Sequence, residues 1–270
     1  MNNIINKQIG LVTVTCKRDF ELIAGLLETI NQYIGDEFDH TIILNDSVDH
    51  MPELLSVCDQ YPRPNRTIIH CDDVGEFKNH KEACHKEYHA CQAQYPEYNH
   101  GLRGSRTGGY LVGWSLAQIL ICYFAQVCQT EYYTILTSRC RIVTHWDLIN
   151  VIQHDKSPVA LSTQCWDELK NDFKLYFEIS YGIFGLDWQK ESSMYTTPST
   201  NTPYFWKTSY MLDLLSYTKE KKNTIFDYVD PYNNPRSACD AYLYSAWLRF
   251  KELTDTTYVT SFDGIVTEVR

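Results

Sequence analysis

A stretch without one charged side chain, from Thr107 to Thr130, is the feature that most constrains how this chain can fold. Its apolar residues predict a helix over about residues 110–128, and a helix without charge on any side has no ordinary solvated face. A short polar turn follows, and then an aromatic and β-branched segment predicts a strand over about residues 132–137. Such a composition is typical of a central strand in a sheet that is covered on both faces. The two elements therefore predict a buried helix that leads into a buried strand.

Three further strands are predicted before this helix, and they alternate with helices. The runs at residues 9–14, 40–45 and 66–71 are β-branched and apolar, and apolar residues at helical spacing fill residues 20–34 and 51–58. Strands that alternate with helices in this way form parallel sheets with right-handed crossovers. The expected fold class is therefore α/β, with a Rossmann-like, mostly parallel central sheet flanked by helices.

The second half of the chain carries a more varied pattern. It predicts helices over 145–153, 209–217 and 238–253, strands over 159–162 and 174–184, and a loop over 192–203. No repeat, low-complexity tract or clear linker divides the sequence. Residues 1–270 are therefore expected to form a single domain, with a polar helical insertion around residues 74–100.

The composition narrows the classes of partner. A formal net charge of −10 argues against a broad electrostatic footprint on nucleic acid, although a local basic groove is compatible with it. The 20 tyrosines suit the recognition of flat or hydroxylated ligands, and they equally suit a core that uses Tyr in place of Phe. Nucleic acid is therefore an unfavoured partner that the sequence does not exclude.

Cysteine usage and the first residues bear on location. The start of the chain lacks the basic and apolar regions of a signal peptide, so the ten cysteines are interpreted as reduced thiols of a cytoplasmic protein. Residues 111–128 are long enough to raise the question of a membrane span. Ser115, Gln118 and Gln126 interrupt this stretch, and its length is at the short end for a span, so a buried helix is favoured.

Residue types that bind zinc gather in the insertion, namely Cys84, His85, His89 and Cys91. On a helix the two histidines share one face and the two cysteines another, and the two pairs do not coincide well. Zinc sites normally bring paired ligands together at tighter spacings. A solvated helical insertion is therefore favoured, and a zinc site stays open.

Polar residues follow the predicted strands, where ligands bind in open α/β sheets. The segment from Thr137 to Arg141 ends the buried strand and is the first place to expect chemistry. Asp46 and the pair Asp72–Asp73 end two neighbouring strands. These acids suit hydrogen bonding to a ribose or a base, and they equally suit capping of the helices that follow.

A loop rich in glycine and arginine, at residues 101–109, opens the uncharged helix. Arg103 and Arg106 can approach a phosphate through backbone amides and guanidinium groups, because the start of a helix attracts anions. A surface loop with incidental arginines is the alternative. Arg139 adds positive charge to the same expected cleft, and this favours an anionic ligand.

Asp240 lies at the start of the last periodic helix, after a turn-forming segment. An acid at this place could act as a general base that faces the cleft. An acid in the first turn of a helix also has a purely structural explanation, because it interacts favourably with the helix dipole. Taken alone, Asp240 favours the structural explanation.

Three short motifs, in order along the chain, resemble those of GT-A type nucleotide-sugar glycosyltransferases, in particular small bacterial and viral ones. Gly113, Trp114 and Gln118 match a helix motif Gly-Trp-x-x-Gln-Gln, with alanine in place of its first glutamine. Residues 136–140 occupy the place of a strand end Leu-Asp-Ser-Asp, and residues 239–244 that of a late helix beginning Ser/Thr-Glu-x-x-Leu-Tyr. The resemblance spans most of the chain.

The departure from these motifs concerns metal binding. Family members with Asp-x-Asp use both acids to hold a divalent metal on the donor diphosphate, and here Thr137 and Arg139 replace them. The cofactor Mn²⁺ or Mg²⁺ stays open, but the usual ligands are absent, because carboxylates bind such a metal and a guanidinium does not. Arg139, Arg141, Arg103 and Arg106 could neutralise the leaving diphosphate instead.

The resemblance implies transfer of a hexosyl or pentosyl group from a nucleotide-sugar donor, with a UDP-sugar foremost, to a carbohydrate or other hydroxyl acceptor. It implies that Asp240 deprotonates the acceptor and that Arg139 meets the diphosphate. The donor-binding residues that it implies are Thr15, Arg18, Asp46, Arg103, Arg106, Gly113, Trp114, Gln118, Thr137 and Ser138. Two alternatives stay open: an inactive binding protein of the same fold, and a glycosyltransferase that acts on modified bases of viral DNA.

Overall fold

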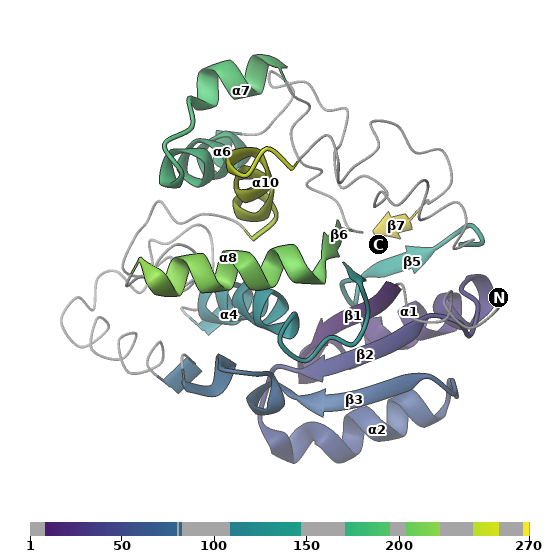
Figure 1. The fold of residues 1–270 in the computed structure, drawn as a ribbon. Coiled ribbons are helices and arrows are strands. Elements are labelled where there is room, and N and C mark those ends of the chain that lie inside the picture. Colours follow the sequence, from purple (N-terminus) through teal and green to yellow (C-terminus); the bar gives the residue numbers. More distant parts are fainter. Residues whose placement is uncertain are drawn as a thin grey trace.

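The computed structural model describes residues 9–79, 81–82, 109–146, 171–194, 204–221, 240–253 and 267–269. Five strands form one sheet in the order β3-β2-β1-β4-β6 (Figure 1). They are β1 (Ile9–Thr15), β2 (Asp39–Leu44), β3 (Arg66–His70), β4 (Tyr132–Ile135) and β6 (Tyr204–Lys207). A second sheet pairs β5 (Cys140–Ile142) with β7 (Thr267–Val269) in antiparallel fashion.

The five-stranded sheet is mostly parallel, as the alternating sequence pattern predicts. β1 pairs in parallel with β2 on one side and with β4 on the other, and β2 pairs in parallel with β3. In this register Leu11 lies between His40 and Thr134. β6 runs antiparallel to β4 and lies beyond it. The four parallel strands therefore present their carboxyl ends along one edge of the sheet.

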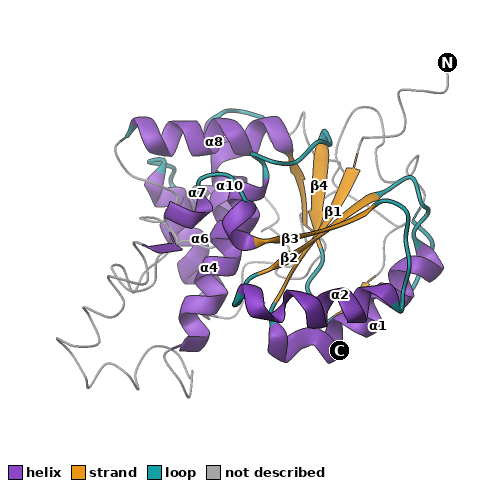
Figure 2. Ribbon diagram, turned by 90° about the horizontal axis from the view of Figure 1, so that it is seen from below, coloured by secondary structure: helices purple, strands orange, loops and turns teal. Residues whose placement is uncertain are grey.

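Helices cover both faces, and Figure 2 shows the two groups on opposite sides of the strands. On one side lie α1 (Phe20–Tyr33) and α2 (Met51–Asp59). The other group comprises α4 (Gly109–Phe124), α6 (Asn171–Ile183), α7 (Trp188–Met194), α8 (Thr208–Glu220) and α10 (Asp240–Phe250). Three single-turn 3-10 helices follow the first three strands, namely η2 (Lys17–Asp19), η3 (Val48–His50) and η4 (Cys71–Asp73). The expected α/β class, a mostly parallel sheet flanked by helices, is confirmed.

α4 is the buried helix that the uncharged stretch predicts. Every residue from Gln118 to Ala125 is buried. The hydroxyl of Tyr133, in β4, donates to the carbonyl oxygen of Ile121 over 3.2 Å and so ties the helix to the strand that follows it. The helix ends at Phe124, earlier than the predicted boundary. Among the described residues, no helix is both long enough and apolar enough to cross a membrane.

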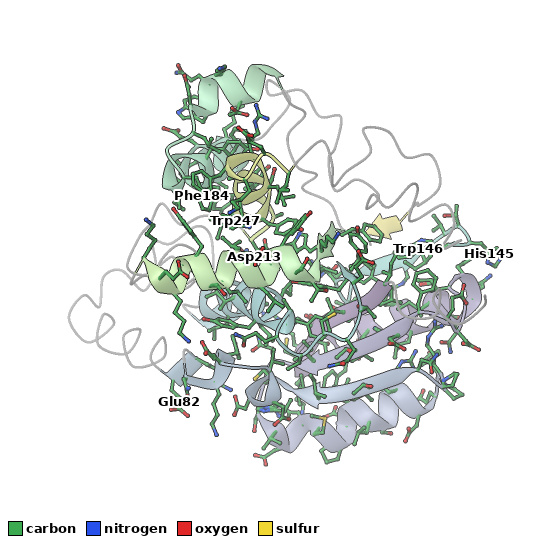
Figure 3. All side chains as sticks on the ribbon, viewed as in Figure 1. Glu82, His145, Trp146, Phe184, Asp213 and Trp247 are labelled. Carbon is green, nitrogen blue, oxygen red and sulfur yellow. The ribbon has the colours of Figure 1, made fainter. Side chains whose placement is uncertain are left out.

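The strands predicted over residues 174–184 are wrong, because this segment is helix α6. Its buried aromatic residues are Phe177, Tyr181 and Phe184, at helical spacings of four and three. The rings of Phe177 and Tyr181 stack with their centroids 4.0 Å apart. The ring centroids of Phe184 and of Trp247 in α10 are 5.7 Å apart (Figure 3). The aromatic alternation in the sequence suited a period of two, and packing against α10 selects the helical period instead.

The start of the helix predicted over residues 145–153 also differs. Trp146 forms an isolated parallel bridge with Ile34, and its ring packs edge-on against Phe38 with centroids 6.3 Å apart. The remaining residues of that range lie outside the described part of the chain. Burial of a large ring beside α1 therefore decides the backbone at this point.

Several other predicted elements lie partly or wholly outside the described residues. Residues 192–194 of the predicted loop belong to α7, and residues 195–203 lie outside the described ranges. The strand predicted over 159–162 and most of the insertion at 74–100 lie outside them as well. The short strands β5, β6 and β7 have no counterpart among the sequence predictions.

None of the six described cysteines forms a disulfide: Cys16, Cys58, Cys71, Cys122, Cys128 and Cys140. The reduced state of all ten thiols stays a prediction. Burial raises the pKa of Cys58 to about 11 and that of Cys122 well above its usual value. These two buried thiols are therefore protonated at neutral pH and are poor nucleophiles.

Candidate functional site

The strand order contains a switch point between β1 and β4. From β1 the chain moves to β2 and β3 on one side, and it returns to the other side of β1 as β4. In open α/β sheets, ligands bind in the crevice outside the carboxyl ends of the strands at such a point. Here those two ends carry Thr15 and the turn from Thr137 to Arg139. The space between them is therefore the candidate site.

Thr15 ends β1 with a buried hydroxyl. The residue is 2% exposed, and its carbonyl oxygen accepts the N–H of Asn45 over 2.8 Å. Within the described residues, Oγ1 of Thr15 has no hydrogen-bond partner. A buried hydroxyl without a partner costs about 1–3 kcal/mol. A ligand or an ordered water at this end of β1 could supply the missing hydrogen bond.

Asp46 follows β2 and connects two loops beside the switch point. Its carboxylate accepts the backbone N–H of Lys17 over 3.0 Å and that of Ser47 over 2.8 Å, and it lies 3.2 Å from Nδ1 of His50. Burial alone would raise the pKa of Asp46, but the two amides and His50 hold it below its ordinary value. Asp46 is therefore ionised and holds the loops in place, which agrees with the structural alternative that its position in the sequence allows.

Arg18 lies in the short helix η2 that follows β1, and it is exposed. Its Nε lies 3.8 Å from a carboxylate oxygen of Asp19, the next residue. An ion pair at this distance, with an exposed arginine as one partner, holds its geometry weakly. Arg18 is thus placed near the end of β1, as predicted, and its contact with a donor stays a prediction.

The turn after β4 presents a positive charge. The N–H of Cys140 donates to the carbonyl oxygen of Thr137 over 2.9 Å and closes the turn. Thr137 and Arg139 are exposed, whereas Ser138 is buried. The hydroxyl of Thr137 lies 3.2 Å from Sγ of Cys140. Arg139 is therefore a solvent-accessible cation at the carboxyl end of β4.

This turn does not fit a divalent metal. A metal on a diphosphate needs hard oxygen ligands, carboxylates foremost. Thr137 and Ser138 supply hydroxyl groups, of which the second is buried, and Arg139 supplies a positive charge that repels a cation. The position where related motifs carry two acids therefore lacks the ligand set for Mn²⁺ or Mg²⁺.

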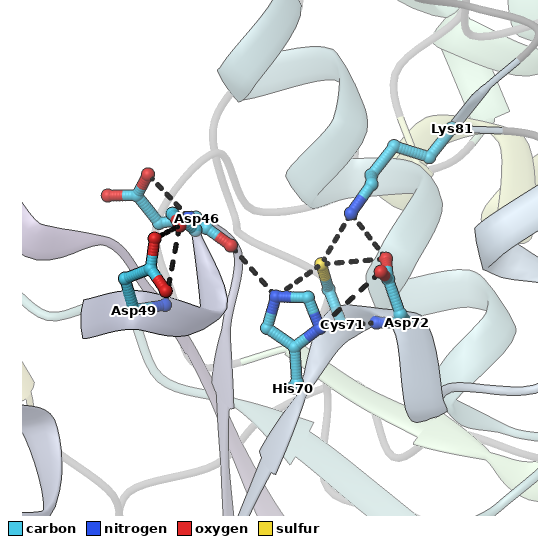
Figure 4. A network of polar contacts seen from close by, with 7 residues as sticks. Asp46, Asp49, His70, Cys71, Asp72 and Lys81 are labelled. Atoms are coloured by element: carbon cyan, nitrogen blue, oxygen red, sulfur yellow. Dashed lines mark hydrogen bonds and ion pairs between the residues drawn. The ribbon is translucent and has the colours of Figure 1, made fainter. Parts of the chain in front are cut away.

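A polar network at the end of β3 lies beside Asp46 (Figure 4). Nε2 of His70 lies 2.8 Å from the carbonyl oxygen of Asp46, and Nδ1 accepts the N–H of Asp72 over 3.3 Å. Lys81 forms an ion pair with Asp72, and its Nζ lies 3.3 Å from Sγ of Cys71. Burial alone would raise the pKa of Asp72, but Lys81 holds it below its ordinary value. The ion pair therefore ties the segment that follows η4 to the end of β3.

The same network resembles a metal site in composition only. Ligand atoms of His70, Cys71 and Asp72 lie within 4.8 Å of one another. Both ring nitrogens of His70 are engaged, since Nε2 donates to a carbonyl oxygen when Nδ1 accepts an amide hydrogen. The ammonium group of Lys81 already supplies the compensating charge. Sequence reasoning missed Lys81, because its polar surroundings give it no distinguishing pattern.

Gln118 and Asp240, both predicted for the site, meet across two helices. The backbone N–H of Asp240, the first residue of α10, donates to Oε1 of Gln118 in α4 over 3.2 Å. The two residues are 6% and 7% exposed. Burial raises the pKa of Cys122 in α4, and the negative charge of Asp240 raises it further. The carboxylate of Asp240 is therefore close enough to α4 to act on this thiol. Asp240 does begin a helix as expected, and its role as a base stays a prediction.

The remaining predicted residues divide into two groups. Gly113 and Trp114 lie in the first half of α4. Arg103 and Arg106, together with the possible zinc ligands of the insertion, lie outside the described residues. The structure therefore brings Thr15 and the Thr137–Arg139 turn to adjacent strand ends and joins Gln118 to Asp240.

Comparisons with known proteins place these features beside solved structures. No protein-family model matches the chain, and no curated protein matches it. The apo crystal structure of mouse xyloside xylosyltransferase 1 covers 94% of this chain and 85% of its own, with 8% identity and a TM-score of 0.48. The apo structure of the bifunctional glycosyltransferase WbbM covers 93% of this chain and 38% of its own, with 8% identity and a TM-score of 0.41. Similarity at this level assigns no family, so function has to come from the site itself.

Proposed function

We propose that this chain is a glycosyltransferase that moves a sugar from a nucleotide-sugar donor, with a UDP-sugar foremost, to a hydroxyl acceptor such as a carbohydrate. One observation carries the proposal. At the switch point between β1 and β4, the buried hydroxyl of Thr15 and the exposed guanidinium of Arg139 lie on adjacent strand ends. A polar group that suits the nucleoside and a cation that suits the diphosphate therefore lie at the ends of neighbouring strands.

The sequence of the loop after β1 distinguishes this site from a dinucleotide-binding site. Dinucleotide-binding folds place the motif G-x-G-x-x-G after the first strand, so that the backbone can approach the pyrophosphate. Here that loop runs Thr15-Cys16-Lys17-Arg18-Asp19 and contains no glycine. The phosphates would have to be held by side-chain cations instead, and Arg139 is well placed for that role. The motif resemblance to nucleotide-sugar glycosyltransferases supports the same choice.

The proposed reaction needs no metal at the end of β4. The bond between the sugar C1 and the diphosphate oxygen breaks, and its electron pair leaves with the diphosphate, where Arg139 stabilises the added charge. A guanidinium suits this task because it pairs with two phosphate oxygens at once. The acceptor oxygen bonds to C1, and its proton passes to the carboxylate of Asp240. Arg103 and Arg106 would add positive charge to the same diphosphate.

A binding protein without catalysis is the second candidate, and one observation favours it. Asp240 is only 7% exposed and begins a helix, so a structural role explains it without any reaction. Hydrolysis or transfer of any donor sugar would exclude this candidate. Transfer onto modified bases of viral DNA is disfavoured by the net charge of −10, and retention on duplex DNA at moderate salt would revive it.

The test is a thermal-shift panel of nucleoside diphosphates and nucleotide-sugars, each with manganese and with chelator. A ligand that binds the native state raises the unfolding midpoint. We expect one nucleotide to raise it equally with chelator present, and Arg139→Ala to abolish that shift while the unliganded midpoint stays unchanged. The control is Lys190→Ala, which removes an exposed charge on α7. A shift that requires manganese would contradict the metal-independent site, and no shift with any nucleotide would contradict the proposed function.

A further inference from the structure

Arg141, in β5, lies against a glycine of α1. A Cβ atom added at Gly25 would lie 2.6 Å from Cζ and 2.7 Å from Nε of Arg141. Carbon atoms in favourable contact are about 3.5–4.0 Å apart, so any side chain at this position would force the guanidinium to move. Glycine is unfavourable inside a helix, and this close approach gives a physical reason for it here.

The same guanidinium holds the turn that follows β4. Nη1 of Arg141 donates to the carbonyl oxygen of Cys140 over 2.7 Å and to that of Ser138 over 3.3 Å. Hydrogen bonds from a charged donor are stronger than those between neutral groups. Arg141 therefore fixes both carbonyl groups that flank Arg139.

A second contact ties the segment to the same face of α1. Oγ1 of Thr29 accepts the N–H of Ile142 over 3.1 Å. Gly25 and Thr29 are one helical turn apart and share a face of α1. With one anchor at the guanidinium and another at the backbone of β5, the turn cannot pivot about a single point.

We propose that Arg141, seated on Gly25, is a positioning residue that fixes the turn carrying Arg139 and so sets the affinity of the site for the diphosphate of the donor. This inference rests on the proposed function, which places Arg139 against that diphosphate. It also gives Arg141 a role other than the charge neutralisation expected from the sequence, since its guanidinium is engaged with its own turn and with α1. Charge-assisted hydrogen bonds to a phosphate weaken steeply when their distance and angle depart from the optimum, so the anchor of the turn bears directly on affinity.

The first experiment compares two glycine-to-alanine substitutions in helices. Gly25→Ala displaces the guanidinium, which can swing away because it is the end of a flexible side chain. Gly182→Ala, in α6, is the matched control, since an added Cβ there meets nothing within 4 Å. Amide hydrogen exchange of residues 137–141, measured without ligand, reports local opening of the turn. We expect faster exchange there in Gly25→Ala alone, and unchanged exchange would overturn the proposal.

The second measurement separates positioning from a general structural effect. Affinities for UDP, UMP and uridine are determined for the wild-type protein and both variants. We expect Gly25→Ala to weaken UDP binding about 10- to 100-fold, which corresponds to the loss of one hydrogen bond to a charged group. The affinity for uridine should be retained, because the turn serves the diphosphate. An equal loss for all three ligands would indicate general damage and contradict the proposal. If the wild-type protein bound none of them, the UDP-sugar donor would be excluded, while the exchange result would still decide whether Gly25 and Arg141 fix the turn.

Arg141→Lys provides an independent variant that leaves α1 unchanged. Lysine keeps the positive charge but lacks the planar guanidinium that lies close to Gly25. We expect the same selective loss of UDP affinity and the same faster exchange as in Gly25→Ala. Wild-type behaviour of Arg141→Lys in both measurements would show that charge alone suffices and would overturn the positioning role.

Discussion

The backbone N–H of Asp240 donates a hydrogen bond to Oε1 of Gln118 over 3.2 Å, and this contact joins the first turn of α10 to the middle of α4. The first N–H groups of a helix lack partners within the helix, so a side chain from elsewhere must satisfy them when they are buried. Gln118 performs that task for α10. It therefore fixes where the carboxyl group of Asp240, the proposed base, enters the molecule.

Replacing Gln118 by alanine should destabilise the protein. The substitution leaves the N–H of Asp240 buried without its acceptor, which costs about 1–3 kcal/mol. Urea unfolding followed by circular dichroism measures the change in free energy. Gln32→Ala, at an exposed position of α1, is the control and should be close to neutral. Equal stability of the two variants would show that the hydrogen bond contributes nothing.

Thr15→Val should weaken nucleotide binding without lowering the stability of the protein. Because Oγ1 of Thr15 is buried without a partner in the described chain, its replacement by a methyl group should leave the free energy of unfolding unchanged or raise it. Affinity for the nucleotide found in the ligand panel should fall, because the ligand loses a hydrogen bond. Isothermal calorimetry measures the affinity, and urea unfolding measures the stability.

Thr13→Val is the matched control for that experiment. Thr13 lies two residues earlier on β1, and its Oγ1 lies 3.1 Å from Nε2 of His40 in the core. Burial lowers the pKa of His40 well below its ordinary value, so the ring is neutral at pH 7. Thr13→Val should therefore destabilise by about 1 kcal/mol and leave nucleotide affinity unchanged. If Thr13→Val lowered nucleotide affinity and Thr15→Val did not, the nucleotide would not contact Thr15.

The ion pair of Asp72 and Lys81 should appear in the pH dependence of stability. The folded pKa of Asp72 is below its ordinary 3.8, since Lys81 outweighs the effect of burial, so its contribution is complete above pH 3.8 and is lost as the pH falls through the folded value. The folded pKa of Lys81 is above its ordinary 10.5, because Asp72 and Cys71 outweigh burial, so its contribution is complete below pH 10.5 and is lost above the folded value.

Asp72→Asn tests this window. The variant should be less stable than the wild-type protein by about 0.5–1 kcal/mol at neutral pH, and the two should converge well below pH 3.8. Urea unfolding across the acid range measures the difference. A difference that persists in acid would assign the loss to the hydrogen bonds of the side chain and not to its charge.

Two helices end in the same motif with different residues. After α6, Leu186 donates to the carbonyl oxygen of Tyr181 and Gly185 to that of Gly182, with Gly185 at a φ of 70°. After α10, Leu253 donates to Leu248 and Glu252 to Arg249, with Glu252 at a φ of 57°. Both are Schellman motifs, in which the left-handed position favours glycine. Glu252 therefore adopts, with strain, the left-handed backbone conformation that Gly185 adopts without strain.

Substitutions at these two positions should change the stability of the protein in opposite directions. Glu252→Gly should stabilise the protein by about 1 kcal/mol, and Gly185→Ala should destabilise it by about the same amount. An alanine Cβ at Gly185 meets nothing within 4 Å, so its cost is purely conformational. Thermal and urea unfolding measure both changes. A destabilising Glu252→Gly would mean that the Glu252 side chain contributes more than the strain of its backbone.

The sequence alone was sufficient for the elements whose burial follows from local pattern. β1, β2 and β3 carry β-branched runs, α1 carries apolar residues at helical spacing, and α4 is apolar without a charged side chain, so each appears close to its predicted range. The parallel arrangement follows from their alternation. The strand ends, with Thr15 and Thr137, could be placed at one edge for the same reason. These features depend on neighbours in sequence, and a local pattern records them.

Tertiary structure decided what depends on distant partners. The sequence around α6 fits a period of two as well as the helical spacing of Phe177, Tyr181 and Phe184, and in the fold the helical face packs against α10. Gly25 and Arg141 lie far apart in sequence, as do Gln118 and Asp240, and no local signal pairs them. Residue types and spacing determined the sheet and its site-bearing edge. The fold decided which side chain satisfies which, because hydrogen bonds and close contacts act through space, and the sequence does not record distances in space.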